Sequence, residues 1–313
     1  MIAGLALAAT GVAILVAGPR LANAAWTTQA PRLGILAWQA LTFTAVAAFV
    51  LAGVTQLIPI TTLADGLGAV FHACAASIAS AYGSAEFLPG ALMGTVLAGI
   101  LPLWVLSCVA RELVSGWRRR RELHRSIDLV AEPDHQLGVL VVDVAAPAAF
   151  CVPGRTSRIV VTTGTLTALA DDELQGVLAH EAAHLRARHN LAVALSQALV
   201  RAFPRLRLFR TASAQTRQLI ELLADDAAAE HVDRVSVASA IVSLAEMRAP
   251  AAAMAMAQEG AALRVSRLLE PATPMDPWRH RLLAGGLWAV LLTPVLIAGL
   301  PTLSAALSDL CNI

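Results

Sequence analysis

Four long apolar runs constrain this chain more than any other feature of its sequence. They cover about residues 1–18, 33–60, 91–110 and 282–303, and each is long enough for a helix to cross the hydrocarbon core of a bilayer, which takes about 17–25 residues. Only 14% of all residues are charged, whereas soluble domains carry about 25%. The sequence therefore predicts a multi-span α-helical membrane protein.

The arginines predict the direction in which these helices cross, because basic residues of short loops stay on the cytoplasmic side. The loop after the first run carries Arg20 and Arg32 and no acidic residue, whereas the loop over 61–90 carries acidic residues and no arginine. Four consecutive arginines at 118–121 follow the third run. We therefore expect both termini outside the cell and residues 111–281 in the cytoplasm.

The spans divide the chain into a membrane part and one soluble domain. The first run lacks the basic start of a signal peptide, so we expect it to be retained as a helix. The cytoplasmic segment is long enough to bury a hydrophobic core of its own. The expected units are three spans within 1–110, a cytoplasmic domain over 111–281, a fourth span over 282–303 and a short external tail over 304–313.

Within the cytoplasmic segment, β-rich runs come before helical ones. Strands are expected over 137–144, 148–152 and 157–162, with a Pro-Gly turn that makes a hairpin of the last two. Helices are expected from the acidic turn at Asp171 and Asp172, either of which can cap the first of them, and over about 214–232 and 234–247. This order predicts an α+β domain rather than a parallel sheet.

The first of these helices carries the segment HEAAH at 180–184. Four residues advance about 400° along a helix, so His180 and His184 leave the same face one turn apart and can bind one zinc ion together. Glu181 follows the first histidine and lies near enough to accept a proton from a water molecule at the metal. The segment therefore predicts a catalytic metal site with Glu181 as the general base.

Two histidines leave such a site incomplete, because a catalytic zinc ion has three protein ligands and an open position. The later segment ELLADD places Glu221 and Asp225 on one face of another helix. Glu221 is the expected third ligand, and Asp225 is expected to hold the far nitrogen of a liganding histidine. His189 is the rival third ligand, but on a continuous helix it would lie about 140° from His180, off the metal face.

Residues 151–225 resemble the gluzincin membrane peptidases of the M48 and M56 groups. The resemblance rests on the segment CVPGRTSRIVVTTGTLTAL, the HExxH helix and the downstream Glu-x-x-x-Asp, in that order. It implies one zinc ion as the cofactor and Glu181 as the base. It also implies that the strand near 158–163 is the edge on which an extended substrate docks. The ligands that it implies are His180, His184 and Glu221, supported by Asp225.

The order of the spans favours M56, the group of the antibiotic-sensor transducers, because three spans, a cytoplasmic zincin and a fourth span are its layout. In that group a sensor domain follows the fourth span; about ten residues follow it in this sequence, so we expect no such domain and infer no stimulus. M56 implies a winged-helix repressor as the protein substrate, and the net charge of +1 gives no reason to expect direct nucleic-acid binding. HtpX-like M48 proteases, which serve membrane-protein quality control, are the alternative. A membrane scaffold that keeps the fold without turnover is the alternative of another class.

The cysteines show no CxxC pair, so a thiolate zinc site is not expected. Cys74 and Cys311 both lie outside the cell in the expected topology, where disulfides persist. The sequence therefore allows a disulfide between them, and two free thiols are the alternative.

Overall fold

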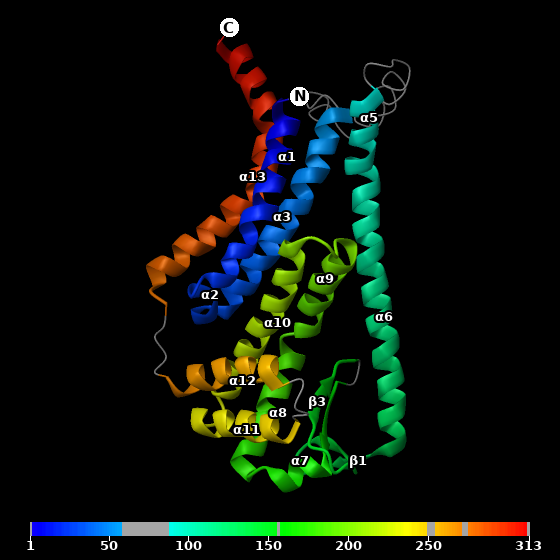
Figure 1. Ribbon diagram of the computed structural model, residues 1–313, viewed down its shortest axis with the longest axis vertical. Coiled ribbons are helices and arrows are strands. Elements are labelled where there is room, and N and C mark those ends of the chain that lie inside the picture. Colours follow the sequence, from blue (N-terminus) through cyan, green and yellow to red (C-terminus); the bar gives the residue numbers. More distant parts are fainter. Residues whose placement is uncertain (1, 58–87, 155–156, 249–253, 271–274, 312–313) are drawn as a thin grey trace.

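The computed structural model describes residues 2–57, 88–154, 157–248, 254–270 and 275–311. Within them, four helices are long and apolar enough to cross a membrane (Figure 1), namely Ile2–Asn23, Pro31–Leu57, Pro89–Val130 and Pro277–Gly299. The predicted multi-span α-helical class is therefore confirmed. The helices alone do not tell the two sides of the membrane apart, so the orientation stays a prediction.

The second span lies at the centre of the membrane part. The first span comprises α1 (Ile2–Ala17) and the 3-10 segment η1 (Gly18–Asn23), and the short helix α2 (Trp26–Gln29) leads into the second span, α3 (Pro31–Leu57). The third comprises α5 (Leu88–Thr95), the π-helical turn η3 (Val96–Ile100) and α6 (Leu101–Val130), and the fourth belongs to α13 (Pro277–Cys311). Helix α3 contacts α1, α13, α5 and η3.

Glycines allow the second and third spans to pack backbone against backbone. A Cβ added at Gly53 of α3 would lie 2.6 Å from the backbone nitrogen of Ala98 in η3. A Cβ at Gly94 would lie 2.8 Å from Cγ of Leu57. Without a hydrophobic driving force in lipid, such close approach at small residues is a main source of helix association.

Helix α6 does not end where the membrane span was expected to end. It runs without a break through the arginine-rich segment to Val130, so the expected domain start at 111 falls inside a helix. Trp104 Nε1 of α6 donates a hydrogen bond to the carbonyl of Ala202 (3.2 Å), and Arg201 donates to Glu112 Oε2 (2.8 Å). The extension of α6 thus forms one wall of the soluble domain (Figure 1).

The sheet of the soluble domain is small and mixed. Its strands are β1 (Ala131–Asp134), β2 (Val139–Val142), β3 (Ala149–Val152) and β4 (Arg158–Thr162), in the order β1-β2-β4-β3, with β2 and β4 parallel and the other pairs antiparallel. The three expected strands are present, and β1 adds a fourth. The docking edge implied by the resemblance is corrected: β4 is paired on both sides, so β3 is the edge strand next to the helices.

Helices make up the rest of the soluble domain, and α8 packs against β3 and β4 of the sheet. They are α7 (Thr163–Ala168), α8 (Asp171–Arg186), α9 (His189–Ala202), α10 (Arg207–Ala228), α11 (Arg234–Arg248) and α12 (Met254–Leu269). Val161 of the sheet packs in one buried cluster with Val177 and Leu178 of α8. The cap of α8 differs from expectation, because Ala170 is the N-cap and its N–H donates to Glu173 (3.0 Å). The α+β fold class is confirmed.

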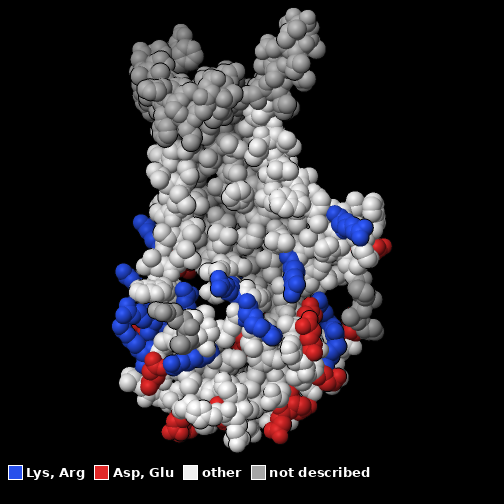
Figure 2. Space-filling model, turned by 180° about the vertical axis from the view of Figure 1, so that it is seen from behind, with Lys and Arg blue, Asp and Glu red and all other residues white. Residues whose placement is uncertain are grey.

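The soluble domain packs against the ends of the membrane helices through the hairpin of α9 and α10. Leu208 at the start of α10 is fully buried, and it shares a cluster with Trp38 of α3 and with Leu219. A Cβ at Gly18 would lie 2.7 Å from Cδ1 of Leu208, so the hairpin touches the end of the first span. From behind, the charged side chains gather in the half that holds this domain, below an uncharged band (Figure 2).

The cysteine prediction lies outside the described part of the structure. Cys74 falls in the segment 58–87, and the Cys311 side chain is also not described. The described cysteines Cys108 and Cys151 are both free thiols.

Candidate metal centre

The three expected ligands meet where α8 crosses α10. His180 and His184 leave one face of α8, and their Nε2 atoms lie 3.1 Å apart. Glu221 of α10 faces both rings, with Oε2 3.5 Å from Nε2 of His180 and Oε1 3.7 Å from Nε2 of His184. The donor atoms of the three residues lie within 4.8 Å of one another. The structure therefore brings the expected ligands to a single point.

This donor set fits a zinc ion. Two imidazole nitrogens at about 2.0–2.1 Å from a tetrahedral zinc ion lie roughly 3.3 Å apart, close to the separation of the two histidines. Two nitrogens and one carboxylate oxygen are a ligand set of catalytic zinc. Among the described residues the group holds no fourth protein donor, which leaves one coordination position for water or substrate.

Asp225 lies behind the first histidine, as the sequence predicted. Its Oδ1 atom is 2.9 Å from Nδ1 of His180, and only 1% of the residue is exposed. Burial alone would lower the pKa of His180, but the carboxylates of Asp225 and Glu221 outweigh it and raise that pKa to about 9. Burial and the neighbouring His180 lower the pKa of His184 to about 4. The pKa values of the two rings are therefore shifted in opposite directions, upward for His180 and downward for His184.

Arg264 is part of the site although sequence reasoning missed it. It comes from α12 and donates two hydrogen bonds of 2.6 Å, from Nε and Nη2, to the two carboxylate oxygens of Asp225. Its Nη1 lies 3.3 Å from Oε2 of Glu221. Burial disfavours the charged form of Asp225 and would raise its pKa. The hydrogen bonds from Arg264 outweigh burial and hold the pKa of that carboxyl below its usual range. No motif marks Arg264, which follows an alanine- and methionine-rich stretch in the sequence.

His189 contacts one of the metal residues, which the geometry of a continuous helix did not predict. Helix α8 ends at Arg186, Arg188 adopts a left-handed conformation (φ 50°), and His189 begins a new helix. The angle calculated for a continuous helix therefore does not apply. Nδ1 of His189 lies 3.1 Å from Nδ1 of His184, so this ring supports the second histidine from behind, while Glu221 completes the cluster of donors.

Glu181, the expected base, faces the edge strand β3. Burial raises the pKa of its carboxyl, although the charge of His180 and a hydrogen bond with the Cys151 side chain oppose that shift. Burial and the Glu181 carboxylate raise the pKa of the Cys151 thiol to about 12, so the thiol stays protonated. The base is thus held between the metal residues and the edge strand.

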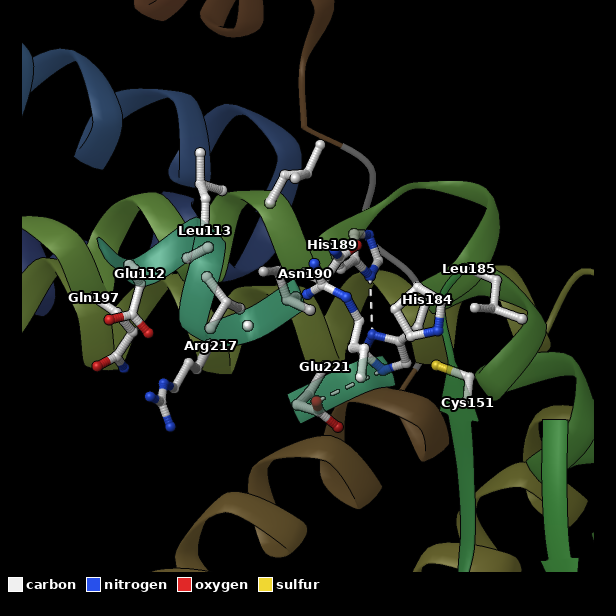
Figure 3. Close-up of a pocket in the computed structure, with 17 residues that line it drawn as sticks. Glu112, Leu113, Cys151, His184, Leu185, His189, Asn190, Gln197, Arg217 and Glu221 are labelled. Atoms are coloured by element: carbon white, nitrogen blue, oxygen red, sulfur yellow. Dashed lines mark hydrogen bonds and ion pairs between the residues drawn. The ribbon is translucent and has the colours of Figure 1, made fainter. Parts of the chain in front are cut away.

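A pocket of about 460 Å³ opens onto these residues. His184 and Glu221 line it together with residues of α6, α9 and the edge strand. Figure 3 shows His184 and Cys151 at one end, Glu112 and Arg217 at the other, and Glu221 between them. The metal residues therefore have a cleft beside them that a substrate can enter.

These features define a class: a multi-span membrane protein whose soluble domain is a zinc metalloendopeptidase of the HExxH type. The sequence profile of peptidase family M48 matches residues 115–271, which is half of the chain. The chain belongs to peptidase family M48. The match supports the alternative drawn from the resemblance and gives no specific support to M56. No curated protein and no solved structure matches the chain.

Proposed function

We propose that this protein is a membrane-embedded zinc endopeptidase that cleaves membrane proteins at the cytoplasmic surface, as HtpX-like quality-control proteases do. One observation carries the proposal: α6, which leaves the membrane, is also a wall of the pocket beside the metal residues. Glu112 lies two residues beyond the expected end of the span, and Arg120 lies eight residues further, or about 12 Å along a helix. A substrate segment that emerges from the bilayer is thus close to the cleft.

The residues take distinct roles in this proposal. His180, His184 and Glu221 would hold the zinc ion, and a zinc ion bound there would supply Lewis-acid chemistry toward a scissile carbonyl and lower the pKa of a water molecule toward 7. Glu181 accepts the proton of the attacking water and passes it to the leaving amide nitrogen. Asp225 holds His180 in the orientation that points Nε2 at the metal.

The edge strand β3 is the proposed docking site for the substrate backbone. Its partner β4 occupies one side only, so the other side has unpaired backbone groups in the described part of the sheet. An extended peptide can add to such an edge by main-chain hydrogen bonds. Cys151 lies on this strand and lines the pocket, which places the added strand beside the catalytic base.

A cytoplasmic location of the peptidase is part of the proposal. The segment that matches family M48, 115–271, falls within the domain expected inside the cell, 111–281. The arginines at 118–121 closely follow the third span. Cysteine labelling from either side of intact cells tests this, with single cysteines placed at Arg119 and in the segment 304–313 of a cysteine-free chain. Labelling of position 119 from outside the cell contradicts the orientation.

Regulated cleavage of a winged-helix repressor is the second candidate. The order of three spans, a peptidase and one span favours it, because this is the layout of the M56 transducers. The two candidates differ in the substrate. Purified protein with zinc in lipid vesicles is given either a co-reconstituted membrane protein with a destabilised span or a soluble winged-helix repressor. Cleavage of the first alone supports quality control, and cleavage of the second alone contradicts it.

Substitution of Glu181, the proposed base, tests in the same vesicles whether the protein is an enzyme. Glu181→Gln removes the proton acceptor and keeps the size of the side chain, so cleavage is expected to stop while zinc stays bound. Equal cleavage by both proteins would favour a scaffold with a contaminating protease.

A further inference from the structure

The pocket beside the metal residues carries positive charge that the described protein does not neutralise. Arg120 of α6 and Arg217 of α10 both line it, and neither forms an ion pair with a carboxylate in the described part of the chain. The acidic residues of the pocket are engaged elsewhere. Glu112 pairs with Arg201, and Glu221 faces the two histidines and Arg264.

The polar neighbour of Arg217 is neutral. The Gln197 amide lies beside the guanidinium of Arg217, and with its oxygen turned toward α10 it would accept hydrogen bonds from that guanidinium. A neutral acceptor orients the guanidinium without cancelling its charge. An arginine in this state keeps donors that can bind both oxygens of a carboxylate.

The apolar walls of the pocket strengthen the electrostatic field of the two arginines. Leu113, Leu191, Val193 and Ile220 are apolar and line the same space. Charges act over longer distances and with larger energies beside low-dielectric walls than in open water. An anionic group that enters the pocket is therefore attracted, and a cationic group is repelled.

Arg217 lies close to the expected position of the scissile bond. It precedes Glu221 by four residues on α10, which is one helical turn or about 6 Å along the axis. Residues of an extended peptide are about 3.3 Å apart. A peptide whose scissile carbonyl lies at the metal therefore places a side chain within about three residues of that bond near Arg217.

We propose that this pocket is a subsite for a carboxylate of the substrate polypeptide, bound by Arg217 and Arg120 within about three residues of the scissile bond. This inference rests on the proposed endopeptidase function. The carboxylate is either the side chain of Asp or Glu or the free C-terminus of the polypeptide. Arg217 and Arg120 are specificity-determining residues, because they select the substrate and take no part in bond cleavage.

The experiment uses the full chain with zinc in detergent micelles and paired fluorogenic peptides. One set carries Asp or Asn in turn at the three positions on each side of the scissile bond. A second set has a free or an amidated C-terminus at the same distances. The expected kcat/KM is about tenfold or more higher for the carboxylate member of at least one pair, because hydrogen bonds to charged groups contribute that much. The set in which the preference appears identifies its source.

The variants assign the preference to the pocket. Arg217→Gln and Arg120→Gln are expected to reduce the carboxylate-over-amide ratio toward one, mainly through KM, and Arg217→Glu is expected to invert it toward a lysine-containing peptide. The matched control is Arg210→Gln, an exposed arginine of the same helix that does not line the pocket, which keeps the wild-type ratio. A ratio of one in the wild type, or a ratio unchanged in both pocket variants, overturns the proposal.

Binding separates this proposal from the endopeptidase function. In the Glu181→Gln protein, fluorescence anisotropy of the same labelled peptides measures Kd without turnover. Tighter binding of the carboxylate member, lost on combining Glu181→Gln with Arg217→Gln, supports the subsite even if the wild type cleaves no peptide. Equal Kd values for both members of every pair contradict the subsite even if cleavage is normal.

Discussion

Asp225 Oδ1 lies 2.9 Å from Nδ1 of His180, on the opposite side of the ring from the Nε2 atom that faces His184 and Glu221. One carboxylate thus lies directly behind the ring, on the side away from the other metal residues. It is itself held by two bonds from Arg264. Residues of three helices, α8, α10 and α12, therefore determine the surroundings of His180.

Asp225→Asn is expected to weaken zinc binding by about 10–100-fold, because partners behind a liganding histidine contribute that much to metal affinity. The amide keeps an oxygen for Nδ1 but loses the charge that favours the proton there. Zinc affinity is measured by titration against a competing chelator. The neighbouring Asp226→Asn is the control, since Asp226 pairs with Arg267 rather than with His180. Equal zinc affinity of the Asp225→Asn protein and the wild type would show that the contact is incidental.

Arg264→Gln is expected to destabilise the soluble domain by about 3–5 kcal/mol, because it leaves the buried Asp225 carboxylate without its cation. The measurement is thermal unfolding of the zinc-free protein in detergent, which removes any effect of metal loss. Arg267→Gln is the control, because its partner Asp226 has a side chain that is 34% exposed and can be solvated. The Tm of the control should fall less, and a larger fall in the control contradicts the assigned role of Arg264.

Glu181→Gln is expected to lower kcat by about 10²–10⁴-fold, the usual contribution of a positioned proton acceptor. Zinc content should remain near one ion per chain, because Glu181 is outside the group of donors. Metal analysis and peptide cleavage on the same preparation check both points. Removal of zinc from the wild type by a chelator should abolish cleavage reversibly. A variant that loses zinc together with activity would make Glu181 a ligand rather than a base.

The sequence predicted those parts of the site that depend on spacing within one helix. HEAAH places two rings one turn apart, and ELLADD places Glu221 and Asp225 one turn apart, whatever the tertiary structure is. Arg264 could not be predicted in this way, because its role depends on how α12 packs against α10. The angle expected for His189 was wrong for a similar reason, whereas its ranking below Glu221 as a ligand agrees with the donor group. A left-handed residue at Arg188 breaks the helix, and no glycine marks that position.

Hydropathy predicted four apolar helices, and four such helices are present in the described residues, but it could not show where the third helix ends. Apolar content stops near Ala110, whereas the backbone continues as a helix because the arginine-rich segment has good helix formers and no proline or helix-ending glycine. The sheet order was also beyond the sequence. Strand patterns give the strands and the hairpin of β3 and β4, but only tertiary packing inserts β4 between β2 and β3.

Gly53→Ala is expected to destabilise the membrane part, because the added Cβ would lie 2.6 Å from the Ala98 nitrogen and from Cβ of Leu97. Both atoms belong to or adjoin the backbone of η3, so α3 and the third span must move apart. Overpacking of this kind costs about 1–3 kcal/mol. Gly99→Ala is the matched control, since no described atom lies within 4 Å of a Cβ there. Thermal unfolding in detergent compares the two variants, and an equal Tm for both would show that the contact at Gly53 relaxes at no cost.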